Sequence, residues 1–123
     1  MDSNLPSVLV LDANQRSALA VTRSLGRSGQ FRITTADATP QALAGASRYS
    51  QGYLQHPDPG QRPRDFIAWM KDLTHHQHFD LIMPTTEVTS QLLLFRRDEL
   101  PEVKLPFAPY ETVMALSDKV SLV

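Results

Sequence analysis

The sequence predicts an α/β domain with a mostly parallel sheet of four or five strands. Short apolar runs alternate with longer segments in which apolar residues recur every three or four positions, as when strands alternate with amphipathic helices. Residues 8–11 read Val-Leu-Val-Leu, which is typical of a strand buried on both faces. We therefore expect three layers, with helices on both sides of the sheet.

Each element is placed by an apolar run, by a helical stripe or by a turn residue. Gly29 is suited to end a helix, and Thr39-Pro40 provides an N-cap and a first-turn proline. The expected elements, in chain order, are a strand at 8–11, a helix ended by Gly29, a strand at 31–35, a short helix from Thr39 to Gly45, a weak strand at 52–55, a helix at 63–76, a strand at 79–83, a helix carrying Val88, Leu92 and Phe95, an extended piece at 105–107 and a short helix at 110–116.

The apolar pattern also predicts how some elements pack. The runs at 8–11 and 81–83 are the most continuously apolar, so we expect them to be neighbouring central strands. Phe66, Trp69 and Leu73 share one stripe of the helix at 63–76. We therefore expect Trp69 to pack that helix against the sheet and not to bind a ligand.

Composition excludes several classes of protein. With 123 residues, 41% hydrophobic and 20% charged, the chain suits one globular domain and not a disordered tail. Twelve basic and thirteen acidic side chains do not favour nucleic-acid binding, and there is no cysteine for a disulfide, a thiolate zinc site or a nucleophile. No apolar run is long enough for a membrane span, and no export signal is recognisable, so we expect a cytoplasmic domain.

Ligands of open α/β sheets bind beyond the carboxyl ends of the strands. The loops expected there contain Asp12, Asp37 and Glu87. The first loop has no glycine, so ordinary NAD or FAD binding is not expected. Thr85-Thr86-Glu87 suits the capping of a helix, and a ligand-facing role for Glu87 is compatible with that. We take Asp12 and Glu87 as candidate substrate-binding residues.

Other charged groups have simpler interpretations. His75, His76 and His78 suit a helix C-terminus better than a metal site, and we expect no metal ligands here. Arg96-Arg97 suits a solvated helix end better than a phosphate clamp.

A phosphorylation receiver domain is a second pattern to consider. The run at 8–12 and the segment Asp80-Leu81-Ile82-Met83-Pro84 are similar to parts of a receiver. A working receiver needs paired acids after the first strand and an aspartate where Ile82 stands, so phosphoryl transfer is not expected. A degenerate receiver-like or other non-enzymatic binding domain remains the alternative.

The C-terminal part resembles a known superfamily. Residues 110–121, which include Asp118-Lys119, look like the segment that leads into the ATP-grasp domain of biotin carboxylases and carbamoyl-phosphate synthases. Residues 8–109 are similar to the Rossmann-like pre-ATP-grasp domain, in the opening strand, the Arg-rich first helix, Ser47-Arg48-Tyr49 and Glu87.

This resemblance implies a three-layer pre-ATP-grasp domain at 1–109, then a linker helix and the start of a truncated ATP-grasp domain at 110–123. The parent protein would be an ATP-dependent ligase forming carbon–nitrogen bonds. ATP and Mg²⁺ would bind downstream, with Lys119 contacting the nucleotide, and Asp12 and Glu87 would face a small carboxylate or amine substrate. We expect this chain alone to be inactive, to bind no cofactor, to pack against the downstream domain and to self-associate, as a possible homodimer, through 110–123.

Overall fold

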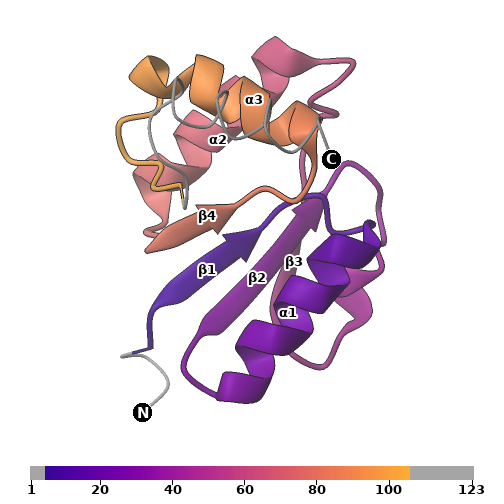
Figure 1. Ribbon diagram of the computed structural model, residues 1–123. Coiled ribbons are helices and arrows are strands. Elements are labelled where there is room, and N and C mark those ends of the chain that lie inside the picture. The colour runs from indigo at the N-terminus through magenta and orange to yellow at the C-terminus, as the bar shows by residue number, and fades with distance from the viewer. Residues whose placement is uncertain (1–4, 106–123) are drawn as a thin grey trace, which may run out of the picture.

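The computed structural model describes residues 5–105 (Figure 1). Apart from the short helix expected from Thr39 to Gly45, the expected order of strands and helices is confirmed in this part of the chain. The elements are β1 (Ser7–Val10), α1 (Arg16–Ser28), β2 (Arg32–Asp37), the 3₁₀ turn η2 (Ala44–Ala46), β3 (Ser50–Gln55), α2 (Pro63–His76), β4 (Leu81–Met83), α3 (Glu87–Phe95) and the 3₁₀ turn η3 (Arg97–Glu99).

The four strands form one parallel sheet in the order β3-β2-β1-β4. The two most apolar runs are neighbours as expected, since Leu9 pairs with Ile82. β1 is central, but β4 is the last strand of the described ladder, so the prediction that both are central was wrong for β4. The carbonyl of Lys104 covers its outer side, accepting a hydrogen bond from the Ile82 N–H at 2.7 Å.

The strand order also excludes the receiver alternative. Receiver domains share the flavodoxin-like order, in which β1 lies between β2 and β3. Here β2 lies between β1 and β3, which is the Rossmann order. In addition, Ile82 is completely buried where a receiver has its phosphorylated aspartate.

The sheet separates two apolar clusters, which gives the three layers shown in Figure 1. Leu9 and Leu11 face α2 and α3, whereas Val8 and Val10 face α1. This alternation follows from the two-residue repeat of a strand. It explains why residues 8–11 are apolar at every position.

The ends of α1 and α2 agree with the sequence. Gly29 follows α1 at a φ of 69°, the left-handed conformation that favours glycine. Pro63 occupies the first turn of α2, where its missing N–H costs no hydrogen bond. On α2, Phe66 and Met70 are fully buried, while Trp69 is half-buried at the edge of the same cluster. Trp69 therefore packs the helix as predicted, at the rim of the core.

The short helix predicted from Thr39 to Gly45 was wrong. The Thr39 hydroxyl donates to the carbonyl of Gln41 and does not cap a helix. The N–H groups of Leu43 and Ala44 donate to the Asn14 side chain at 3.2 Å and the Ala13 carbonyl at 2.7 Å. Partners on the first loop thus replace helical hydrogen bonds, and only the turn η2 forms.

The extended piece predicted at 105–107 lies partly outside the described residues. Its first residue, Leu105, packs with Val103 against the cluster beneath α2 and α3. The helix predicted at 110–116, the domain boundary at 109/110 and Lys119 all lie outside the described residues. Within residues 5–105, no helix has both the length and the apolar character that a bilayer span requires.

Candidate functional site

The carboxyl ends of β1 and β4 lie side by side at the topological switch point of the sheet. From β1 the chain builds the sheet outward on one side through β2 and β3, and it then returns to add β4 on the other side of β1. Asp12 follows β1 and Thr85-Thr86 follows β4, so the two loops lie side by side, as the parallel sheet predicts. This crevice is the usual ligand position of an open α/β sheet, and we take it as the centre of the candidate site.

Asp12 bridges this crevice. Its carboxylate accepts hydrogen bonds from the backbone N–H groups of Thr85 and Thr86, both at 2.9 Å, and from the Thr89 hydroxyl at 2.6 Å. Asp12 is 7% exposed and has a φ of 59°, the left-handed conformation that aspartate tolerates better than most residues. The protein thus places its own anion at the N-terminus of α3, a position where helices in general attract negative charge.

Thr86 is the N-cap of α3, because its side chain accepts a hydrogen bond from the Thr89 N–H at 3.3 Å. The capping interpretation of this segment is confirmed. Glu87 occupies the first turn of α3, where a negative charge interacts favourably with the helix dipole. Its side chain is exposed and accepts a hydrogen bond from the Gln91 amide at 3.0 Å. Glu87 is therefore available to a ligand at this edge.

The first loop is held on its other side by Asp37, at the end of β2. The Asp37 carboxylate accepts from the N–H groups of Asn14 at 2.8 Å and Ala38 at 2.6 Å. An acidic residue at this strand end is the group that binds ribose in dinucleotide-binding domains. In this structure the Asp37 carboxylate joins the loop after β1 to the loop after β2. Asp12 and Asp37 therefore both stabilise the fold.

An open hollow of about 560 Å³ lies beside the first loop, on the α1 side of the sheet. Its polar groups include the Asn14 side chain and the Tyr53 hydroxyl, which donates to the Thr39 carbonyl. Burial raises the pKa of Tyr53 above its ordinary value. Gly45 lines the hollow, and a Cβ there would lie 2.8 Å from the Tyr53 ring. The volume suits a small ligand.

His56, whose imidazole is buried in the structure, was not identified from the sequence. His56 is 4% exposed; its Nδ1 donates to the Pro57 carbonyl at 2.8 Å, and its Nε2 has no hydrogen-bond partner. The ring packs against Phe66 and Trp69, at centroid distances of 4.8 and 5.2 Å. The sequence signal for this burial is weak: His56 directly follows β3, and the next helix, α2, carries the aromatic residues Phe66 and Trp69.

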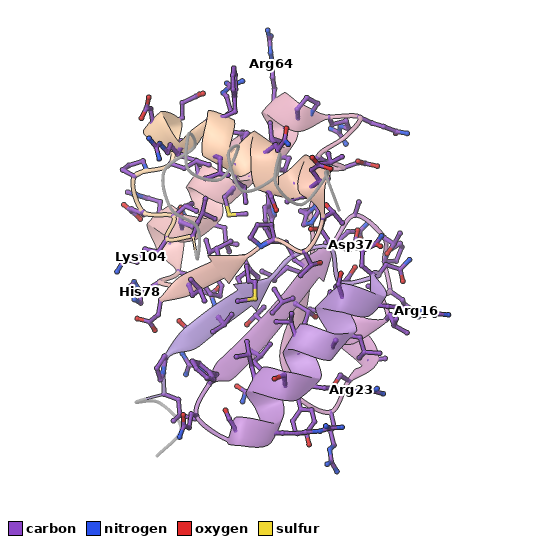
Figure 2. All side chains as sticks on the ribbon, viewed as in Figure 1. Arg16, Arg23, Asp37, Arg64, His78 and Lys104 are labelled. Atoms are coloured by element: carbon purple, nitrogen blue, oxygen red, sulfur yellow. The ribbon has the colours of Figure 1, made fainter. Side chains whose placement is uncertain are left out.

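The other candidate groups lie apart from this edge. His75, His76 and His78 are exposed, and each lies within 4.0 Å of a single carboxylate. Figure 2 shows His78 near Lys104, at the amino end of β4. In the part of the chain that the structure describes, no three His, Asp or Glu side chains are grouped to hold a metal ion. Arg96 pairs with Glu99 on its own turn, which agrees with the solvated helix end expected for Arg96-Arg97.

No family model matches this chain, and no curated protein sequence matches it. Among solved structures, it is similar to a Rossmann-fold NAD(P)-binding family protein from Shigella flexneri, with a TM-score of 0.57 and 15% sequence identity. The match covers 83% of this chain and 50% of that protein, so the chain corresponds to about half of its length. At this identity the likeness establishes the Rossmann-like fold.

Proposed function

We propose that this chain is the N-terminal, substrate-side domain of an ATP-grasp ligase. The observation that carries the proposal is the bridge between Asp12 and the N-terminus of α3. A Rossmann-like domain with a glycine-free first loop and its own carboxylate in the switch-point crevice is poorly suited to a pyrophosphate. It is well suited to form one wall of a site whose nucleotide is bound by another domain.

The sequence resemblance supports the same assignment. Residues 8–109 resemble a pre-ATP-grasp domain, and Asp118-Lys119 resembles the entry to the ATP-grasp fold. In such a ligase the substrate carboxylate attacks the γ-phosphate of ATP, giving an acyl phosphate and ADP. An amine then attacks the acyl carbon and inorganic phosphate leaves. Mg²⁺ and the downstream domain would supply the charge stabilisation, and by the resemblance Lys119 would contact the nucleotide.

Within the described part of the chain, we assign the substrate contact to Glu87. Its exposed carboxylate at the switch-point edge can accept hydrogen bonds from an amine substrate. Asp12, which the sequence also nominated, contributes by fixing the N-terminus of α3 and hence the position of Glu87. In the complete enzyme, Glu87→Gln should raise the KM for the amine about tenfold. Asp72→Asn, which removes one exposed carboxylate charge on α2, is the matched control.

Calorimetry tests the proposal on the chain itself. We expect neither Mg-ATP nor NADH to bind more tightly than millimolar, because the loop after β1 contains no glycine and the Asp12 carboxylate bridges the crevice. A protein that joins this domain to an ATP-grasp body should bind Mg-ATP at micromolar concentrations. Micromolar nucleotide binding by the 123-residue chain would contradict the proposal, as would a failure of that joined protein to bind Mg-ATP.

A further inference from the structure

Three arginine side chains gather at the amino end of the sheet, away from the candidate site. Arg23 and Arg27 come from the last turns of α1, and Arg48 comes from the segment before β3. Together with Ser47 and Tyr49 they line an open hollow of about 530 Å³. Figure 2 shows Arg23 farther along α1 than Arg16, with Asp37 and the carboxyl edge of the sheet toward the Arg16 end.

These positive charges are not balanced by nearby acids. Among residues 5–105, no carboxylate lies within 4.0 Å of any of the three guanidinium groups. Arg23 and Arg27 are four residues apart on one helix, a spacing at which like charges repel. The whole chain has a net charge of −1, so this local excess of positive charge does not follow from the overall composition.

The hollow is built around Tyr49. The Arg48 guanidinium donates to the Tyr49 hydroxyl at 2.8 Å and lies 4.9 Å from the centre of its ring. This hydrogen bond lowers the pKa of Tyr49. Tyr49 in turn lies directly on α1, where a Cβ at Gly26 would overlap the tyrosine side chain. Arg48 is therefore oriented before any ligand arrives. Among residues 5–105 its guanidinium donates only to Tyr49, so its other N–H groups can bind a ligand.

A purely structural interpretation explains only part of this arrangement. Arg27 is in the last turn of α1, where a cation interacts favourably with the helix dipole. That effect falls off within one turn, so it does not account for Arg23, and Arg48 belongs to a different segment.

We propose that this hollow, which we call the arginine pocket, binds the phosphate group of a small phosphate-bearing molecule. The planar guanidinium group of arginine can donate two parallel hydrogen bonds to the oxygens of one phosphate. Three arginine side chains together carry enough positive charge to balance a phosphate dianion. The volume is that of a small-molecule site. Because the arginine pocket lies at the opposite edge of the sheet from Asp12 and Glu87, it does not depend on the proposed ligase function.

The test titrates the chain with inorganic phosphate, at constant low ionic strength, and follows backbone amide signals by NMR. We expect saturable shifts centred on residues 46–49 and on the last two turns of α1. Arg48→Gln should weaken binding about tenfold, the loss of roughly one charge-assisted contact. Arg48→Lys should weaken it nearly as much, because the charge remains but the planar fork is lost.

Arg64→Gln is the matched control, because it removes one exposed positive charge at the far end of the molecule (Figure 2). We expect it to change the affinity less than about twofold. Arg23→Gln, on the exposed face of α1, replaces Arg48→Gln if the latter unfolds. Phosphate binding that is absent, or that Arg64→Gln weakens as much as the arginine-pocket variants do, would overturn the proposal.

Discussion

The Asp12 carboxylate accepts a hydrogen bond from the Thr86 N–H, across 74 residues of sequence, and so joins the end of β1 to the start of α3. The same carboxylate also satisfies the Thr85 N–H and the Thr89 hydroxyl. One side chain thus provides the hydrogen-bond acceptor for two backbone donors at a helix N-terminus, which otherwise lack partners within the helix.

Replacing Asp12 should therefore destabilise the fold. Asp12→Ala leaves three donors without their acceptor and places alanine at a positive φ, so we expect a loss of about 3 kcal/mol in the free energy of unfolding. Asp12→Asn keeps an acceptor and tolerates the positive φ, so it should cost about 1–2 kcal/mol. Urea denaturation measures both, with the exposed loop variant Gln15→Ala as control. Equal losses for Ala and Asn would contradict the roles assigned to the acceptor oxygens and to the positive φ.

Gly26 shows a different coupling, between a helix interior and the residue before a strand. Alanine usually stabilises a helix relative to glycine by about 1 kcal/mol. Here its Cβ would overlap Tyr49, so we expect Gly26→Ala to destabilise the chain by about 2 kcal/mol. In the Tyr49→Ala background the same change should become stabilising. A double-mutant cycle by chemical denaturation measures this reversal, and additive effects would show that the two residues are not in contact.

The sequence predicted most of what depends on local patterns. β1, α2 and the capping of α3 follow from an apolar run, a helical stripe and a threonine, all of which act within a few residues. The parallel sheet then predicted that the loops of Asp12 and Thr85 would meet. The short helix after Thr39 failed because its donors found partners on the first loop, 29 to 31 residues away in sequence. Such tertiary hydrogen bonds override local propensity and leave no local signal.

The burial of polar side chains could not be predicted from the sequence either. Nothing near His56 indicates that its ring is enclosed by Phe66 and Trp69, because α2 brings these side chains over it. The arginine pocket has the same origin, since Arg48 meets Arg23 and Arg27 only when β3 aligns beside β2. Local patterns therefore locate the elements, whereas the clusters of charged and polar side chains come from their packing.

The core beneath α2 provides a graded test of packing. Phe66 is completely buried, so Phe66→Ala should cost about 3–5 kcal/mol in unfolding free energy. Trp69 is half-buried, so Trp69→Ala should cost about half as much, less than its full side chain would suggest. Thermal and urea denaturation of both variants measure the order. A larger loss at Trp69 than at Phe66 would contradict the arrangement of the core.

The last prediction concerns acid stability and Asp80. The hydrogen bond from the Ser7 N–H, at 2.7 Å, is the main cause that holds the pKa of Asp80 below its ordinary value, and the His78 ring adds to it. A depressed pKa in the folded state means that this contribution to stability is fully present above the unfolded pKa, about 3.9, and is lost as the pH falls through the folded pKa.

Asp80→Asn should therefore lower the free energy of unfolding at pH 6, and its free energy of unfolding should approach that of the unmodified chain in strong acid. The free energy of unfolding, measured in urea between pH 6 and pH 2, follows this convergence. In a His78→Ala background the stability difference should persist, because Ser7 is the principal partner; its disappearance there would assign the effect to the histidine instead.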